Sequence, residues 1–234
     1  MQPFPGRGVF FLLRHGETEW NRERRIMGRR PVPLSERGRA QLVSLAPHLA
    51  NLGIARIWTS PLPRARATAE LIAGQLGGVP VLDEEGLTEV HYADWEGKTF
   101  LDLRDDPLFQ EFRKDPIGTP FPGGGESLLE VRDRVFAAMG RIASAGDGAP
   151  AVVVSHGDPL RLILCGCLGM DVAQLRRIRV DNGALSAVEL TGDWAEVKFV
   201  NMRPDLDVML QLAPAAARAP RRQHDEPVSP LGGG

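Results

Sequence analysis

The chain alternates between short continuous apolar runs and longer segments in which apolar residues recur at helical spacing. A short apolar run bounded by turn residues predicts a strand that is buried on both faces. One such run is formed by residues 8–13, and two others lie within residues 55–62 and 149–157. We also expect extended chain at 79–90 and a hairpin at 184–200.

Four segments predict helices, several of them with recognisable ends. Ser35 is placed to cap the first helix, and Ser127 with Glu130 forms the sequence of a capping box before the third. Pro159 fits the first turn of the fourth, where its missing N–H is not needed. The four segments are 33–53, 64–78, 126–144 and 158–170.

Strands that alternate with helices predict an α/β fold, a three-layer sandwich with a mostly parallel sheet and helices on both faces. Residues 92–125 are rich in Asp, Pro, Phe and Gly with weak periodicity, and we interpret them as a small lid insertion. We expect residues 1–212 to form one domain. Residues 213–234 are rich in Ala, Pro, Gly and Arg, so we expect a disordered tail.

Composition excludes several classes of protein. The net charge is −2, so no bulk attraction to nucleic acid or to an anionic membrane is expected. No apolar stretch is long enough to span a bilayer, and the N-terminus has no signal-peptide pattern. Cys165 and Cys167 lack the spacing of zinc ligands. We interpret them as buried free thiols, which suits a cytoplasmic location.

Two of the predicted strands end in the same unusual way. Arg14, His15 and Gly16 follow the first, and His156 and Gly157 follow the run that ends at 155. Ligands of open α/β sheets bind beyond the carboxyl ends of the strands, so both histidines are expected at the ligand-binding edge. Local hydrogen bonds would explain one strand-end histidine. Two of them, each followed by glycine, indicate a functional site.

Arg64 marks the end of a third strand. It follows the Ser60-Pro61 turn and falls in the first turn of a helix, where the backbone favours anions over cations. Either solvation or a bound anion explains an arginine there. Together with Arg14 and the two histidines, it describes a pocket for a dianion such as phosphate.

At these residues the sequence resembles the histidine phosphatase superfamily, also called phosphoglycerate mutase-like. The Arg-His-Gly-Glu-Thr motif alone is moderately specific, whereas five matching stretches in order form a strong signal. They are LLRHGETEWN, SPLPRARATAE, LTEVHYADWEGKT, PGGGES and VVVSHGDPLR, between about residues 9 and 165.

The resemblance implies a role for each matching residue. His15 corresponds to the nucleophile that becomes a phosphohistidine, and Arg14 and Arg64 correspond to the arginines that hold the phosphate oxygens. His156 corresponds to the second pocket histidine, which donates a hydrogen bond to the phosphoryl group. Further contacts with the substrate are implied for Asn21, Gly28 and Gly157.

The proton donor is selected by the resemblance alone. Glu89, in LTEV, matches the acid that protonates the leaving alkoxide, a role that needs a carboxyl group kept protonated by desolvation. From the residues themselves, Glu84, Glu85 and Glu96 are equally available.

A neutral imidazole with one free nitrogen is a competent nucleophile near pH 7. The other nitrogen of His15 must then hold the proton, and we expect it to bond to a backbone carbonyl near Gly16. That arrangement leaves no room for a bulky neighbour.

Some residues depart from the family pattern. Met27 and Pro31 stand where relatives often have Gln and Asp, which changes the pocket rim and bears on specificity. Arg29 and Arg30 fit either a positive funnel or a solvated surface. The side chains of Trp20 and Trp95 are expected to pack rather than to stack on a substrate.

The segment 98–127 is shorter than the insertion of the mutase branch, and its FRKDP resembles the end of a lid helix in phosphatase members. Arg113 and Lys114 fit either an acidic substrate or a solvated face. We therefore expect a histidine acid phosphatase-type enzyme that hydrolyses small phosphomonoesters without a metal or cofactor, as a monomer or homodimer. The hairpin region also resembles α-ribazole phosphatases. The alternatives are a phosphoglycerate mutase and an inactive phosphate-binding protein of the same fold.

Overall fold

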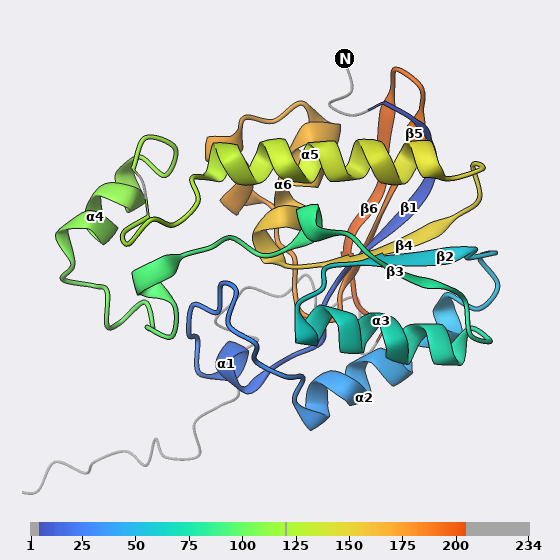
Figure 1. The fold of residues 1–234 in the computed structure, drawn as a ribbon, viewed down its shortest axis with the longest axis horizontal. Coiled ribbons are helices and arrows are strands. Elements are labelled where there is room, and N and C mark those ends of the chain that lie inside the picture. Colours follow the sequence, from blue (N-terminus) through green and yellow to red (C-terminus); the bar gives the residue numbers. More distant parts are fainter. Residues whose placement is uncertain (1–4, 120, 205–234) are drawn as a thin grey trace, which may run out of the picture. The chain divides into compact units, whose positions relative to one another are not determined.

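The computed structural model describes residues 5–119 and 121–204, so the predicted tail at 213–234 lies outside the described residues. Within this part of the chain, six strands form one sheet in the order β3-β2-β4-β1-β5-β6 (Figure 1). Strands β1 to β4 run parallel, β5 is antiparallel to β1, and β6 is antiparallel to β5. The strands are β1 (Arg7–Arg14), β2 (Arg56–Thr59), β3 (Val81–Asp83), β4 (Ala151–Ser155), β5 (Leu185–Thr191) and β6 (Ala195–Met202).

The four predicted helices, α2, α3, α5 and α6, begin within three residues of the predicted segments, whereas α1 and the start of α4 were not predicted. Ser35 accepts a hydrogen bond from the backbone of Gly38, and Ser127 and Glu130 form the capping box of α5. The α-helices are α1 (Glu19–Arg22), α2 (Glu36–Leu45), α3 (Pro63–Gln75), α4 (Pro107–Lys114), α5 (Leu128–Ala145) and α6 (Gly157–Leu168). Short 3₁₀ turns are η1 (Ala46–His48), η2 (Glu85–Leu87), η3 (Ala93–Trp95) and η4 (Val172–Arg177).

Two expected boundaries differ from the structure. The helix predicted over 33–53 ends at Leu45 and continues as the 3₁₀ turn η1, because Pro47 has no N–H for the next α-helical bond. The segment 79–90 is extended only at β3 and then folds into η2.

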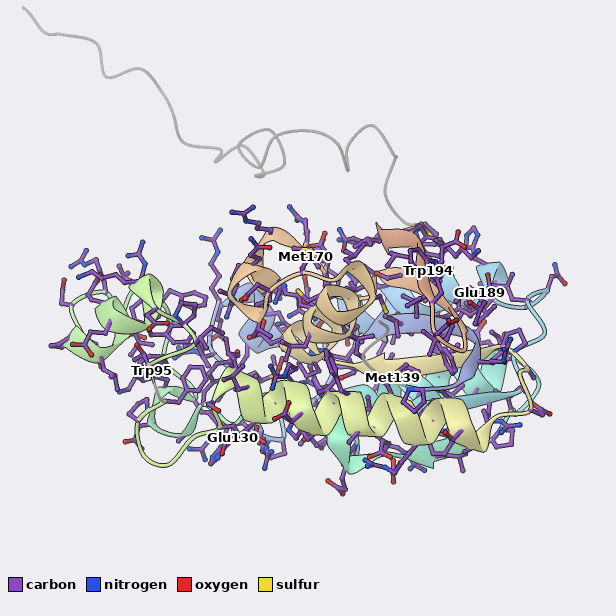
Figure 2. The ribbon with its side chains drawn as sticks, turned by 90° about the horizontal axis from the view of Figure 1, so that it is seen from above. Trp95, Glu130, Met139, Met170, Glu189 and Trp194 are labelled. Carbon is purple, nitrogen blue, oxygen red and sulfur yellow. The ribbon has the colours of Figure 1, made fainter. Side chains whose placement is uncertain are left out.

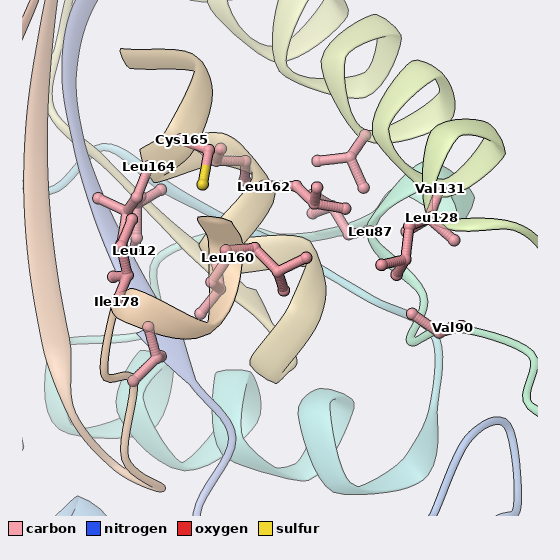
Figure 3. Packing of buried hydrophobic residues seen from close by; sticks show 14 of the residues in the cluster. Leu12, Leu87, Val90, Leu128, Val131, Leu160, Leu162, Leu164, Cys165 and Ile178 are labelled. Atoms are coloured by element: carbon pink, nitrogen blue, oxygen red, sulfur yellow. The ribbon is translucent and has the colours of Figure 1, made fainter. Parts of the chain in front are cut away.

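Alternate residues of β1 enter two different cores. Phe10 and Leu12 belong to the core that α5 and α6 cover, part of which is shown in Figure 3. Phe11 and Leu13 belong to the core on the opposite face, under α2 and α3. A strand that is apolar at every position therefore suits a sheet with helices on both faces. This arrangement confirms the predicted three-layer sandwich (Figure 1).

Strand register brings the predicted site residues together. Arg14 of β1 pairs with Ser155 of β4, and Thr59 of β2 pairs with the neighbouring Val154. The ladder continues past the strand ends, because the backbone N–H of His15 donates to the carbonyl of Ser155 at 3.0 Å. The carboxyl ends of three adjacent parallel strands therefore meet at one edge of the sheet.

The segment predicted as a lid carries η3, α4 and an aromatic cluster. Trp95 is 1% exposed, and its ring makes edge-to-face contacts with Phe109, Phe112 and Phe121 at centroid distances of 5.4 to 5.6 Å. Figure 2 shows Trp95 on the chain beside α4. The packing role expected for Trp95 is confirmed.

Two further expectations concern the cysteines and membrane spans. Both cysteines are free thiols: Cys165 is buried and Cys167 is partly exposed. In the described residues, no helix combines the length and the apolar character needed to cross a membrane.

Candidate active site

A cavity of about 340 Å³ opens at the carboxyl ends of β1 and β4. Its walls include seven of the eight residues expected from the sequence: Arg14, His15, Asn21, Gly28, Arg64, Glu89 and Gly157. The eighth, His156, is fully buried behind this wall, and its ring centroid lies 5.1 Å from that of His15. The fold therefore gathers all eight around one site.

His15 is held as a neutral imidazole with one nitrogen free. Its Nδ1 lies 2.8 Å from the carbonyl oxygen of Gly16, which can only accept, so the proton is on Nδ1 and Nε2 keeps its lone pair. Burial keeps the pKa of His15 well below its ordinary value, and Arg64 and Arg14 lower it further. A Cβ at Gly16 would lie 2.8 Å from the carbonyl oxygen of Gly38, so the neighbouring residue must be small, as expected.

Arg64 is fully buried and is fixed by the loop that precedes α2. Its Nη2 donates to the carbonyl of Gly28 at 2.7 Å, and its Nη1 donates to that of Arg30 at 2.9 Å. Desolvation lowers the pKa of Arg64 to about 10, which leaves the guanidinium charged near neutral pH. Its direct hydrogen-bond partners are carbonyl dipoles, and the negative charges of Glu89 and Glu96 partly offset the desolvation.

Besides Nε1 of Trp95, three buried nitrogen atoms around this site have no hydrogen-bond partner among the described residues. They are Nε of Arg14, Nε of Arg64 and Nδ1 of His156. A buried polar atom without a partner is destabilising by about 1–3 kcal/mol, so three in one site require an explanation. A bound oxyanion would accept hydrogen bonds from all three.

His156 is oriented by a residue that the sequence analysis treated only as part of a turn. Its Nε2 lies 2.8 Å from Oγ of Ser60, which in turn accepts from the backbone N–H of Leu62 at 3.3 Å. When Ser60 donates to Nε2, the proton of His156 is on Nδ1. Burial keeps the pKa of His156 well below its ordinary value, with a further contribution from Arg64. The position of Ser60 at the end of a third strand is the sequence feature from which this contact with His156 could have been predicted.

Glu89 is the candidate acid whose side chain reaches the cavity. The backbone N–H of Gly157 donates to its Oε2 at 3.2 Å, and that of Val90 donates to Oε1 at 3.0 Å. Burial raises the pKa of Glu89, and the negative charge of Asp158 raises it further. Neither Glu85 nor Glu96 lines the cavity.

Arg134 of α5 holds the segment that presents Glu89. Its guanidinium donates to the carbonyls of Gly86 at 2.9 Å, Thr88 at 2.7 Å and Glu89 at 3.0 Å. It also pairs with Glu126 of the PGGGES stretch at 2.8 Å. This role could not be predicted from the sequence, because an arginine on a helical face is most often a solvated residue.

The predicted substrate contacts differ in which of their hydrogen-bonding groups remain free for a ligand. Asn21 Oδ1 accepts from the backbone and hydroxyl of Thr18, so its amide nitrogen is the group available to a ligand. The carbonyl of Gly28 accepts from Arg64, and the N–H of Gly157 donates to Glu89. The two glycines therefore shape the cavity and organise its charged side chains.

Asp158 organises a charged cluster in the cavity wall that was not predicted from the sequence. It pairs with Arg161 at 2.7 Å and Arg176 at 3.2 Å, and it accepts a hydrogen bond from the hydroxyl of Tyr92. Although burial by itself raises the pKa of Asp158, Arg176 and Arg161 keep it below its ordinary value. The position of Asp158 two residues after His156 is the sequence feature from which a role near the site could have been predicted.

Comparison with known proteins identifies the family. Residues 10–203 match the model of the histidine phosphatase superfamily, branch 1, and the chain belongs to this superfamily. It is 34% identical over 182 residues to the protein named "Probable phosphoglycerate mutase GpmB" of Escherichia coli O1:K1, covering 76% of this chain and 83% of that protein.

Solved structures with the same fold include phosphatases. The alpha-ribazole phosphatase of Shigella flexneri is 28% identical, with a TM-score of 0.76 over 83% of this chain and 96% of that one. A phosphoserine phosphatase of Entamoeba histolytica is 27% identical, with a TM-score of 0.76 over 85% of this chain and 100% of that one. The chain is thus a member of an enzyme superfamily of phosphatases and mutases.

Proposed function

We propose that this protein is a histidine acid phosphatase-type enzyme that hydrolyses small phosphomonoesters through a phosphohistidine on His15, without a metal ion. The observation that carries the proposal is the set of unpartnered donors beside His15: Nε of Arg14, Nε of Arg64 and Nδ1 of His156. Phosphoryl transfer spreads negative charge over the equatorial oxygens, and catalysis is mainly positioning and electrostatic stabilisation. Donors already fixed by the fold are suited to that task.

The reaction has two steps. In the first, Nε2 of His15 attacks phosphorus, the phosphorus–oxygen bond to the substrate alcohol breaks, and Glu89 gives its proton to the departing oxygen. In the second, Glu89 takes a proton from water as the water attacks the phosphohistidine, which frees His15 and inorganic phosphate. A pKa raised by burial suits Glu89 to both steps, because the same group must be able to hold and release a proton.

The mutase remains a second candidate, because the curated relative described above carries that name. A mutase must hold the second end of a phosphoglycerate, and Arg24 and Arg161 line the cavity. Aromatic side chains of the lid segment line the same cavity, and this favours phosphatase action on less polar alcohols. Assays of 3-phosphoglycerate with and without 2,3-bisphosphoglycerate distinguish the two: a mutase forms 2-phosphoglycerate, whereas a phosphatase releases phosphate.

Rapid-quench experiments with labelled substrates test the assigned roles. His15→Ala should form no acid-labile phosphoenzyme with any substrate. Glu89→Gln should lose about 10²–10³ in the phosphorylation rate with an alkyl phosphate, but far less with p-nitrophenyl phosphate, whose leaving group needs little protonation. Glu85→Gln is the matched control, because Glu85 is exposed and should behave as wild type.

Equal impairment of Glu89→Gln with both substrates would show that Glu89 is not the acid. Hydrolysis by the His15→Ala variant at the wild-type rate would refute the phosphohistidine route. Phosphate binding without hydrolysis of any phosphomonoester would identify the inactive phosphate-binding protein instead.

A further inference from the structure

One wall of the active-site cavity is aromatic rather than polar. Trp95 stands at its centre, in edge-to-face contact with three phenylalanines, and Phe100 lies 6.0 Å from Phe109 between ring centroids. Mutual packing of this kind fixes the rings before a ligand binds, so little side-chain entropy is lost on binding. The rings that line the cavity are Tyr92, Trp95, Phe100, Phe109, Phe112 and Phe121.

The apolar lining also includes two residues between α1 and α2. Ile26 and Met27 line the cavity, and both are almost completely buried. Met27 occupies the position where the sequence analysis noted a departure from glutamine. Apolar side chains from the lid segment and from the chain before α2 therefore both contribute to the cavity lining.

A second cavity of about 380 Å³ adjoins the first. The two share Phe100, Phe109, Phe112 and Arg176 in their walls, so the aromatic surface extends from one into the other. Phe100 is 53% exposed, an unusual state for a large apolar side chain, and a ligand spanning both cavities would cover it.

The far cavity is cationic. Arg104, Arg113 and Arg176 line it, and no carboxylate does. Arg104 and Arg176 pair with Asp105 and Asp158, respectively. Arg113, in the last turn of α4, has no hydrogen-bond or ion-pair partner in the part of the chain that the structure describes.

From these contacts we infer the class of substrate, on the basis of the phosphatase function proposed above. The substrate is a phosphomonoester whose alcohol is flat and apolar, with a second anionic group at the end remote from the phosphate. The phosphate occupies the donors beside His15, the apolar body lies along the exposed ring of Phe100, and the remote anion meets Arg113.

Four synthetic substrates with the same type of alkyl leaving group separate these contributions. They are ethyl phosphate, 2-(2-naphthyl)ethyl phosphate, and the 6-carboxylate and 6-carboxamide of the latter. The naphthyl compound should have a kcat/KM about tenfold or more above that of ethyl phosphate. The carboxylate should exceed the neutral carboxamide by about threefold, the size expected of a partly exposed ion pair.

Paired variants locate the effect. Phe100→Ala should reduce the naphthyl-to-ethyl ratio of kcat/KM, whereas Leu101→Ala, a 71% exposed neighbour outside both cavities, should not. Arg113→Gln should abolish the carboxylate-to-carboxamide preference, and Lys114→Gln should retain it. Each comparison is a ratio within one variant, so partial loss of folded protein cancels.

Equal kcat/KM for all four substrates, or ratios that the Phe100 and Arg113 variants leave unchanged, would overturn the inferred substrate class while hydrolysis itself upholds the phosphatase function. Hydrolysis of none of the four, with no phosphoenzyme detected, would overturn both.

Discussion

Arg64 donates a 2.7 Å hydrogen bond to the carbonyl of Gly28, thirty-six residues earlier in the chain. The loop that supplies this carbonyl is itself held by Glu96. Oε1 of Glu96 accepts from the backbone N–H of Arg29 at 3.0 Å, and its Oε2 pairs with the side chain of Arg30 at 3.2 Å. A Cβ at Gly28 would lie 2.1 Å from Glu96, so the loop and the carboxylate fit closely. Glu96 thus positions Arg64, the arginine proposed to bind phosphate, without lining the cavity.

We predict that Glu96→Ala weakens inhibition by inorganic phosphate and vanadate about tenfold, because losing the loop's hydrogen bonds is worth about 1.4 kcal/mol at Arg64. The measurement is the inhibition constant of each anion, with circular dichroism to confirm folding. Glu96→Gln should restore part of the affinity, since its amide oxygen can still accept from Arg29. Glu85→Ala is the exposed control. Unchanged inhibition constants in Glu96→Ala would remove the positioning role.

The charge of Asp158 should set the alkaline limit of activity. Its negative charge raises the pKa of Glu89, which must be protonated to act as the acid. Asp158→Asn removes that charge and leaves Arg161 and Arg176 without their carboxylate, so the pKa of Glu89 falls. The alkaline limb of kcat/KM against pH, measured with an alkyl phosphate, should therefore move to lower pH.

Arg176→Gln gives the opposite test. It leaves the charge of Asp158 less neutralised, so the alkaline limb should move to higher pH. Both variants are compared on one substrate, whose own ionisation is common to all profiles. Movement of the two limbs in the same direction would contradict the electrostatic explanation.

Protein stability should fall as the pH drops below about 7. The folded state lowers the pKa of both His15 and His156 below the ordinary value of 6.5, so the unfolded chain binds more protons at acid pH. The free energy of unfolding then decreases with falling pH, by at most about 1.4 kcal/mol per pH unit for each histidine. Urea titrations between pH 7 and pH 5 measure the slope.

Substitution of His156 by Gln should reduce that slope, whatever it does to the absolute stability. His48→Gln serves as the control, because His48 is exposed and its loss should leave the slope as in wild type. If the slope of His156→Gln matched that of wild type, the acid sensitivity would have to come from other groups.

Activity should not depend on a divalent metal. The guanidinium groups of Arg14 and Arg64 already supply positive charge where a metal ion would stabilise the phosphoryl group. Phosphate release from p-nitrophenyl phosphate should be unchanged after dialysis against EDTA. Loss of activity that magnesium or zinc restores would contradict the proposed chemistry.

The sequence by itself determined the layers of the fold and most residues of the proposed anion site. Every position of β1 from Phe10 to Leu13 is apolar, which is possible only for a strand with cores on both faces, and the caps of α2 and α5 are local patterns. The histidines follow strands directly, so the sequence placed both at the carboxyl edge of the sheet, although the pairing of β1 with β4 that makes them neighbours is tertiary. These features depend on neighbours in sequence, and they could be predicted from it.

Tertiary structure decided the rest. Nothing local separates Glu89 from Glu85 and Glu96: one enters the cavity, one faces solvent, and one ties down a loop. The hydrogen bond of His156 with Ser60 and that of Arg134 with Glu89 join residues ninety-six and forty-five positions apart. Such partners are set by how the loops pack once the sheet has formed. The burial and charge that shift a pKa depend on that packing, so the sequence suggested which residue types were present and the folded chain assigned their roles.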